Sequence, residues 1–348
     1  MHTTQKVDIL FRLGEILNSI GLQKDWPGYD IGINEEEYNH LRDLIKRVHV
    51  YNGWFTEESI LKSFMGISKW MDKSILNDFV SSYGQGEKQK TVAIIMAGNI
   101  PMVGFHDLMC VYLSGHKALV KLSSDDDKLI PVILNVLRLF DEKIDEVIQL
   151  SDGKLENFDA VIATGSDNSS SYFQEYFGKY PHIIRKHRTS IGVLDGTESK
   201  EDLVQLGHDI FDYYGLGCRN VSKLFVPKGY DFKDFFEAIF DFNPIIHHHK
   251  YANNYDYNKA VYLMNQVPIL DNNFVMLKED DTLYSPLGVV LYEFYEDDDQ
   301  LKTKLSELSE EIQVIAGKNH LEFGKAQSPD INDFADRVNT MEFLSSLR

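Results

Sequence analysis

The chain has 348 residues and a mass of 40.1 kDa, which is enough for two domains or for one large domain. Lys and Arg total 35 and Asp and Glu total 54, so the formal net charge is −19, and we expect neither nucleic acid nor an anionic membrane as a partner. Apolar residues make up 43% of the chain and aromatic residues 12%, which excludes a disordered protein.

Residues 1–90 predict a helical N-terminal region. Near the N-terminus, apolar side chains recur at helical spacing: Val7, Leu10, Leu13, Leu17 and Ile20. This pattern indicates an amphipathic helix rather than a secretory leader, and no run reaches the roughly 18 apolar residues that span a bilayer. The two cysteines, far apart in sequence, match neither a disulfide scaffold nor a zinc-ligand spacing. We therefore expect a cytoplasmic protein with free thiols.

From residue 91, short apolar runs alternate with helical stretches. The runs TVAIIMA, ALVKL, EVIQL and FDAVIATGS predict the parallel strands of a doubly wound α/β sheet over residues 91–188. A second segment of the same kind covers residues 189–320, with TSIGVL, VSKLFVP and PLGVVLYEFY. The sequence therefore predicts two α/β domains behind the helical region.

The first candidate site follows the first of these strands, in AIIMAGNIPMVGFHDLMC. Gly98 and Asn99 form the turn, and we expect a helix that contains Pro101 in its first turn and ends at Gly115. In open α/β sheets, ligands lie beyond the carboxyl ends of strands, and a helix N-terminus favours a phosphate or an oxyanion. The alternative is that the Asn99 side chain only closes the turn.

Two more strand ends carry polar or small residues. Lys121 and Ser123 stand at the C-terminal end of the strand in ALVKLSSDDDK, where a lysine can reach a ribose or a phosphate, although a surface lysine is the alternative. Thr164, Gly165 and Ser166 follow FDAVIA, where small residues allow a dinucleotide to approach the backbone, or else only end the strand and cap a helix.

Cys218 is the candidate nucleophile. It follows the glycines of GLG and precedes Arg219 and Asn220, so its thiolate can be stabilised by a cation or by backbone amides. Cys110, within the apolar helix DLMCVYL, is instead expected to be a small buried hydrophobe. Burial as an ordinary core residue is the alternative for Cys218 as well.

Two clusters of basic or imidazole side chains each have two alternative interpretations. Adjacent side chains diverge on a helix or a strand, so we expect no metal site at His247–His249; a patch that contacts substrate or transfers protons is the alternative. The basic run 185–188 either meets the phosphates of coenzyme A or covers a surface.

Taken in order, AGNIP, VKLS, ATGS, GLGC and SPLGVV resemble the aldehyde dehydrogenase superfamily. The longer stretches GNIPMVGFHDLMCVYLSGHKALVKLS, ATGSDNSSSYF and FGKAQSPDINDFADRVNTMEFL are similar to its acyl-CoA reductase branch, typified by the LuxC-like fatty acid reductase that makes long-chain aldehyde for bacterial luciferase. The resemblance covers roughly residues 85–348. It implies a nicotinamide-cofactor domain over 91–188, a catalytic domain over 189–320, and a segment over 321–348 that packs back on the cofactor or on a partner subunit.

The resemblance also implies roles for single residues. Cys218 would accept the acyl group of a fatty acyl-CoA, and the Asn99 side chain and the Cys218 backbone N–H would hold the oxyanion before reduction to the aldehyde. The implied cofactor-binding residues are Gly98, Lys121, Ser123, Ser124, Thr164, Gly165, Ser166 and Gly288. Ser124 stands where NAD-specific relatives place a glutamate, which favours NADPH, and the neighbouring Asp125 keeps NADH as the alternative.

One departure from the superfamily bears on the reaction. Hydrolytic relatives carry a glutamate base where this chain has PHIIRKHRTSIGVL, without Asp or Glu, so reduction of a thioester is favoured over oxidation of an aldehyde. The acyl donor is acyl-CoA or an acyl carrier, and an acyl-protein synthetase partner and a homo-oligomer both remain open. The alternatives are a reductase of acyl phosphates, a non-catalytic nucleotide-binding subunit and a thiol hydrolase.

Overall fold

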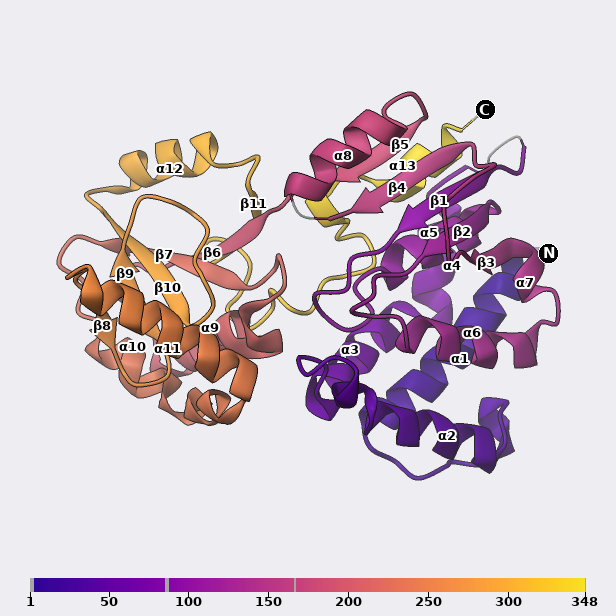
Figure 1. Ribbon diagram of the computed structural model, residues 1–348, viewed down its shortest axis with the longest axis horizontal. Helices are drawn as coiled ribbons and strands as arrows, with labels where there is room; N and C mark the ends of the chain where they lie inside the picture. The colour runs from indigo at the N-terminus through magenta and orange to yellow at the C-terminus, as the bar shows by residue number, and fades with distance from the viewer. Residues whose placement is uncertain (1–2, 85–87, 166, 348) are drawn as a thin grey trace. The chain divides into compact units, whose positions relative to one another are not determined.

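The computed structural model describes residues 3–84, 88–165 and 167–347. The chain divides into two compact units: the first contains residues 1–186 and 330–348, and the second contains residues 187–329 (Figure 1). Within the described residues, none of the helices has both the length and the apolar character that crossing a bilayer requires.

The first unit contains the helical region and a parallel sheet. Its elements are α1 Thr3–Gly21, η1 Tyr29–Ile31, α2 Glu35–Ile45, η2 Val48–Val50, α3 Glu57–Trp70, α4 Lys73–Ser81, β1 Thr91–Ile95, α5 Phe105–Ser114, β2 Lys117–Lys121, α6 Leu129–Phe140, α7 Ile144–Val147, β3 Ile148–Leu150, β4 Ala160–Thr164, α8 Asp167–Phe177, β5 His182–Arg185, η5 Ala335–Arg337 and α13 Thr340–Ser345. The predicted amphipathic helix is confirmed as α1, whose five predicted apolar side chains are all buried.

The sheet of the first unit has the order β3-β2-β1-β4-β5, with every neighbouring pair parallel. Its core on one face includes side chains of α5 and α6, and its core on the other face includes side chains of α8 (Figure 1). Ile95 at the end of β1 pairs with Lys121 of β2 and with Ala163 of β4. The candidate residues after these strands therefore share one edge, at the point where the strand order reverses.

The predicted helix start near Pro101 is wrong. Residues 101–104 form turns, and α5 begins at Phe105 because Met102 has a φ of 61°, which a right-handed helix does not allow. The Met102 backbone N–H instead donates to Oδ2 of the buried Asp126, over 2.8 Å. The predicted end at Gly115 is confirmed, since Gly115 caps α5 with a φ of 92°.

The second unit is built around a six-stranded sheet with the order β11-β6-β7-β10-β9-β8. Only β8 runs antiparallel to its neighbour among these described strands. Its elements are β6 Thr189–Val193, α9 Lys200–Phe211, η3 Asp212–Gly215, β7 Val221–Pro227, α10 Lys233–Ala238, η4 Ile239–His247, α11 His249–Met264, β8 Leu270–Asp271, β9 Met276–Glu279, β10 Val289–Tyr295, α12 Asp298–Glu307 and β11 Ile312–Ala316. Side chains of α9 and α10 pack in one core, and Leu301 of α12 packs in another.

The C-terminal segment 330–348 completes the first unit through buried polar contacts. Arg185 at the end of β5 is almost fully buried, and it pairs with Asp107 of α5 through both terminal nitrogens, one of them over 2.8 Å. The same guanidinium donates to Thr340 Oγ1 over 3.1 Å and to Thr164 Oγ1 over 3.2 Å. Arg185 is therefore neither a surface residue nor a ligand of coenzyme A phosphates. His116 adds a second link, since its Nε2 lies 2.9 Å from the Leu344 carbonyl oxygen.

Burial by itself would raise the pKa of Asp107, but the charge and hydrogen bonds of Arg185 outweigh it and lower that pKa. The substitution Arg185→Met leaves a buried carboxylate without its cation, and we expect a loss of about 3–5 kcal/mol in the free energy of unfolding. The double variant Asp107→Leu/Arg185→Met leaves no buried charge and should recover most of that loss. All three tryptophans, Trp26, Trp54 and Trp70, lie in the first unit, so urea unfolding followed by tryptophan fluorescence measures this unit alone. Equal stability of Arg185→Met and the unchanged protein would contradict the prediction.

Candidate active site

Cys218 lies in a short loop between η3 and β7, and it is half-buried. The chain enters this loop through three successive residues with left-handed backbone: Tyr213 (φ 54°), Tyr214 (φ 60°) and Gly215 (φ 79°). Only the glycine adopts this conformation without cost, since a side chain there strains the backbone by about 1 kcal/mol or more. The surrounding contacts must therefore fix the loop.

Asn220 provides most of these contacts. Its Oδ1 accepts from the Gly217 N–H over 2.8 Å, and its Nδ2 donates to the carbonyl oxygens of Asp209, Ile210 and Asp212, the closest at 2.6 Å. The side chain is 2% exposed, so each of these polar groups depends on the others for a partner. Asn220 thereby connects the cysteine loop to the C-terminal end of α9.

Ser190 holds the other side of the loop. Its hydroxyl donates to the Cys218 carbonyl oxygen over 3.0 Å and accepts from the Val314 N–H over 3.1 Å. Ser190 lies on β6 and is fully buried, and Val314 lies on the neighbouring β11. The backbone of the candidate nucleophile is thus connected directly to the central sheet.

A third set of contacts comes from the segment around Gly324. Arg219 donates from Nη1 to the Ala326 carbonyl oxygen over 3.2 Å. The buried Asp209 of α9 accepts from the N–H groups of Gly324 and Ala326, over 2.7 and 2.9 Å. Gly324 has a φ of 79°, and a Cβ there would come within 2.3 Å of Gln205 Oε1, so the sequence FGKA needs its glycine.

A cavity of about 220 Å³ adjoins the cysteine loop, and Gly217 and Asn220, one on either side of Cys218, both line it. Thr189, Val221 and Val289 also line the cavity, and each is the first residue of a strand, of β6, β7 and β10. The cavity therefore lies at the amino ends of these strands, not at the carboxyl ends where ligands of open α/β sheets usually lie.

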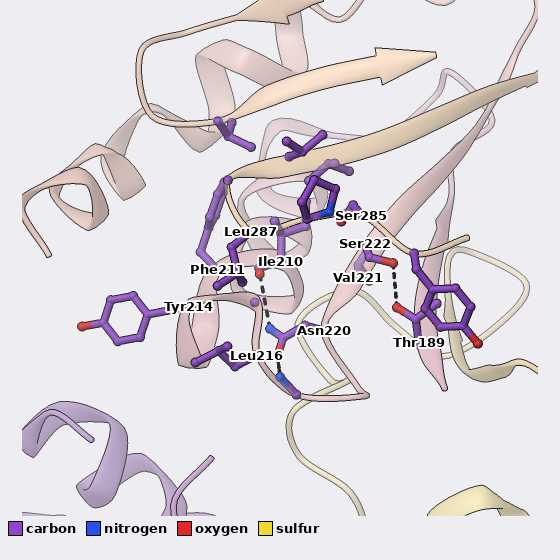
Figure 2. A pocket seen from close by; sticks show the side chains of 18 of the residues that line it. Thr189, Ile210, Phe211, Tyr214, Leu216, Asn220, Val221, Ser222, Ser285 and Leu287 are labelled. Atoms are coloured by element: carbon purple, nitrogen blue, oxygen red, sulfur yellow. Dashed lines mark hydrogen bonds between the residues drawn. The ribbon is translucent and has the colours of Figure 1, made fainter. Parts of the chain in front are cut away.

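The two sides of the cavity differ in chemistry. Figure 2 shows Ile210, Phe211 and Leu287 on one side and Thr189 and Ser222 on the other. The hydroxyls of Thr189 and Ser222 lie 2.6 Å apart, and Ser222 donates to the Leu283 carbonyl oxygen over 3.0 Å. None of the described residues that line the cavity is Asp or Glu. The cavity therefore combines an apolar wall with the hydroxyls of Thr189 and Ser222, the His187 imidazole and the Arg188 guanidinium, and none of its described lining residues carries a carboxylate.

Gly288 lines the same cavity, in the turn before β10. It has a φ of 80°, and a Cβ there would come within 3.0 Å of the Tyr255 backbone. Asn258 of the same helix, α11, donates from Nδ2 to the Leu287 carbonyl oxygen over 3.0 Å. The turn is thus held closely against α11, which only glycine at position 288 permits.

The other cofactor candidates lie in the first unit, at the carboxyl edge of its sheet. Gly98 is buried against Ser123, because a Cβ on Gly98 would come within 2.6 Å of the Ser123 side chain. Asn99, Lys121 and Ser124 are exposed at the same edge, and Thr164 and Gly165 are half-buried. Ser166 lies outside the described residues. A close-packed glycine, an exposed lysine and the strand-order reversal at β1 and β4 fit a nicotinamide dinucleotide.

Two other residues that the sequence analysis singled out, Cys110 and His248, have contacts that contribute to packing or helix capping. Cys110 is fully buried, burial raises the pKa of its thiol, and its Sγ lies 3.8 Å from Nδ1 of His106. His248 caps α11 by accepting from the Tyr251 N–H. Within the part of the chain that the structure describes, no group of three or more His, Cys, Asp or Glu is arranged to hold a metal ion.

The positioning residues Asn220, Ser190 and Asp209 were not found from the sequence. Asn220 stands two residues after the cysteine, but its partners on α9 lie 10 and 11 residues earlier in the chain, and nothing local marks them. Ser190 and Asp209 bond to residues more than a hundred positions later in the chain. The glycines of GLGC were the usable signal, because they indicate a constrained loop.

The fold defines the class of protein. The structure is similar to an NAD-dependent aldehyde dehydrogenase from Sinorhizobium meliloti (TM-score 0.64, 11% identity, 94% of this chain and 72% of that chain) and to aldehyde dehydrogenase 21 from Physcomitrella patens (TM-score 0.60, 12% identity, 88% and 71%). It is also similar to an indole-3-acetaldehyde dehydrogenase from Pseudomonas syringae in complex with NAD⁺ (TM-score 0.60, 11% identity, 87% and 70%). The predicted aldehyde-dehydrogenase-like fold is confirmed.

Within that class, residues 34–240 match the acyl-CoA reductase (LuxC) family, and the chain belongs to this family. It is also similar to the long-chain acyl-protein thioester reductase of Aliivibrio fischeri, with 21% identity over 222 residues. That match covers 55% of this chain and 46% of the relative, so the chain aligns with about half of its length. The resemblance inferred from the motifs is confirmed.

Asp209 should make the stability depend on pH. Burial raises its pKa to about 6, although the N–H groups of Gly324 and Ala326 oppose the shift. The native state then holds a proton that the unfolded state releases near pH 4, so stability should fall as pH rises from about 4 to about 6, by about 3 kcal/mol. Burial raises the pKa of Asp126 to about 6 as well, which adds a change of the same sign.

Differential scanning calorimetry between pH 4 and pH 7 measures the stability of the folded protein and tests this expectation. Asp209→Asn should remove its share of the dependence and leave the share that is due to Asp126, and Asp241→Asn, at an exposed position, should leave the dependence unchanged. An identical pH dependence in the unchanged protein and in Asp209→Asn would contradict the assignment.

Proposed function

We propose that the chain reduces an acyl thioester to the aldehyde through an acyl intermediate on Cys218, with NADPH as the reductant. The observation that carries the proposal is the cysteine loop, which Asn220 and Ser190 hold beside a cavity that has an apolar wall. Membership of the acyl-CoA reductase (LuxC) family supports the same reaction.

In the first step, the Cys218 thiolate attacks the thioester carbonyl carbon. A carbon–sulfur bond to Cys218 forms, the bond to the leaving thiol breaks, and the thiol that leaves takes up a proton. Because Ser190 and Asn220 fix the backbone on both sides of Cys218, the sulfur attacks from a restricted position, which lowers the entropic cost of the step.

The negative charge that develops on the carbonyl oxygen must be stabilised by hydrogen-bond donors. We assign this role to the Asn99 side-chain amide and to the Cys218 backbone N–H, which the family resemblance implies. Asn99 follows the closely packed Gly98 at the carboxyl edge of β1, so its backbone position is restricted by the packing of Gly98 against Ser123.

When bound, NADPH supplies a hydride to the acyl carbon. We assign its binding to Gly98, Lys121, Ser123, Ser124 and the turn of Thr164–Ser166, with Gly288 near the nicotinamide end. Ser124 offers a neutral hydroxyl where a carboxylate would repel a 2′-phosphate, which supports NADPH over NADH. The bond between the acyl carbon and the Cys218 sulfur then breaks, which releases the aldehyde and restores the thiolate.

The absence of Asp and Glu among the described lining residues of the cavity supports reduction over hydrolysis. Release of a carboxylic acid from the acyl enzyme would need water activated by a general base. Transfer of the acyl group from a thiol, followed by hydride addition, needs no such water.

The acyl donor is coenzyme A or a carrier protein. The relative from Aliivibrio fischeri is named for an acyl-protein thioester, which supports a protein-bound donor and a synthetase partner for this chain as well. We place the reaction in the cytoplasm, where thiols such as Cys218 stay reduced.

Mixing the protein with acyl-CoA thioesters, without nicotinamide, should add the mass of the acyl group. Cys218→Ala should abolish the adduct, and Cys110→Ala should retain it, because the buried Cys110 thiol has a raised pKa and is not nucleophilic. Addition of NADPH should discharge the adduct as aldehyde. Intact-mass spectrometry measures the first result and a carbonyl assay the second.

Two outcomes would overturn the proposal. An adduct that persists in Cys218→Ala would assign the nucleophile elsewhere. A lack of adduct with every thioester, while NADPH still binds, would favour an acyl-phosphate substrate or a non-catalytic subunit.

Asn99→Ala should lower kcat by about 10²–10³, because one oxyanion donor is lost, while KM for the thioester changes little. The matched control is Asn18→Ala, on an exposed position of α1. Steady-state kinetics with NADPH measures both constants, and an unchanged kcat in Asn99→Ala would refute the role of the amide.

A further inference from the structure

We propose that Asp126 is a positioning residue for Asn99: its buried carboxyl group holds the backbone of the turn that carries the Asn99 amide. The inference rests on the proposed function, in which that amide stabilises the oxyanion. The contacts that carry it join the turn of residues 98–104, after β1, to the loop of residues 122–128, after β2.

The turn and the loop lie close together because their strands are neighbours. Ile95, the last residue of β1, pairs with Lys121, the last residue of β2, so both segments leave the same edge of the sheet. A Cβ on Gly98 would lie 2.6 Å from the Ser123 side chain and 3.1 Å from the Asp126 backbone nitrogen. The loop is therefore near enough to hold the turn.

The middle one of three successive aspartates in the loop makes the contact. Asp125 is exposed and Asp127 is half-buried, but Asp126 is only 5% exposed. Oδ2 of Asp126 accepts a hydrogen bond from the Met102 N–H over 2.8 Å. Because Met102 is 2% exposed, water does not replace the carboxyl group as the acceptor.

The Met102 backbone is strained and depends on this contact. Its φ of 61° lies in the left-handed region, which a residue with a side chain adopts only where its surroundings hold it. The buried Ser63 hydroxyl of α3 also contacts the turn, since it donates to the Pro101 carbonyl oxygen over 2.9 Å. Ser63 and Asp126 thus hold the residues two and three positions after Asn99.

The burial of Asp126 is unfavourable in itself. A buried carboxyl group lowers stability unless its oxygens find partners, and Oδ1 of Asp126 has none among the described residues. Burial raises the pKa of Asp126 to about 6, although hydrogen bonds from the Met102 and Leu129 N–H groups oppose the shift. Since an apolar side chain would fill the space without this penalty, the contribution of Asp126 is its acceptor for Met102.

The consequence for catalysis is that the Asn99 amide is held in place before the reaction begins. An oxyanion donor lowers the barrier most when it is in position before the charge develops. The Asn99 side chain is exposed, so its position depends on the backbone that carries it. If the turn relaxes at Met102, the amide moves away from the oxyanion, and a displacement of about 1 Å costs up to about 10²-fold in rate.

Asp126→Ala removes the acceptor and should lower kcat by about 10–10²-fold at saturating NADPH, while KM for the acyl-CoA changes little. Asp126→Asn keeps an oxygen for the Met102 N–H and should retain most of kcat. In the Asn99→Ala background, Asp126→Ala should cause no further loss, because both changes remove the same interaction. The matched control is Asp127→Ala, at the half-buried neighbour that pairs with Lys128 over 3.0 Å, and it should leave kcat unchanged.

A second measurement observes Asn99 directly. In protein labelled with ¹⁵N at the asparagine side chains, the Asn99 amide is assigned as the NMR signal that Asn99→Ala lacks. Asp126→Ala should shift or broaden this signal, and Asp126→Leu, which fills the space without an acceptor, should do the same. Asp126→Asn and Asp127→Ala should leave it in place. Tryptophan fluorescence, which reports on the first unit, confirms that each variant is folded.

The outcomes separate this inference from the proposed function. An unchanged Asn99 signal in folded Asp126→Ala and Asp126→Leu would overturn the inference and leave the reaction intact. A loss of kcat that is equally large in the Asn99→Ala background, or equally large in Asp127→Ala, would also overturn it. If the unchanged protein forms neither adduct nor aldehyde, the proposed reaction fails, and the Asn99 signal alone still decides whether Asp126 holds the turn.

Discussion

The candidate site depends on the hydrogen bonds of the buried Asn220 side-chain amide. An amide removed from water must find partners within the protein, and those of Asn220 are the Gly217 N–H and the last carbonyl groups of α9. These carbonyl groups occupy the right positions only when α9 is packed in its core. The position of the Cys218 loop is therefore a consequence of the packing of the whole second unit, and the strained backbone at Tyr213 and Tyr214 is held by the same contacts.

The two units present candidate residues at opposite ends of their strands. In the first unit, Gly98 follows β1, and Lys121 and Thr164 are the last residues of β2 and β4, so all three lie at the carboxyl ends of these strands. In the second unit, the cavity lies at the amino ends of β6, β7 and β10.

Much of the α/β organisation was accessible from the sequence, because it depends on local patterns. The apolar runs predicted β1, β2, β4, β6, β7 and β10, and the glycine at position 115 predicted the end of α5. The helix start near Pro101 failed because Met102 takes a left-handed conformation, and its N–H bonds to Asp126 from a distant part of the chain. Arg185 was misjudged for a related reason: its partner Asp107 lies on another element, and no local pattern marks a buried ion pair.

The order of the segments has a consequence for biosynthesis. Residues 187–329 form the second unit, and they are synthesised before residues 330–348, which belong to the first. On the ribosome, Arg185 and His116 are exposed long before Thr340 and Leu344 emerge to contact them. The unit that begins first is thus completed last, and the second unit acquires all of its residues while the first still lacks its final helix.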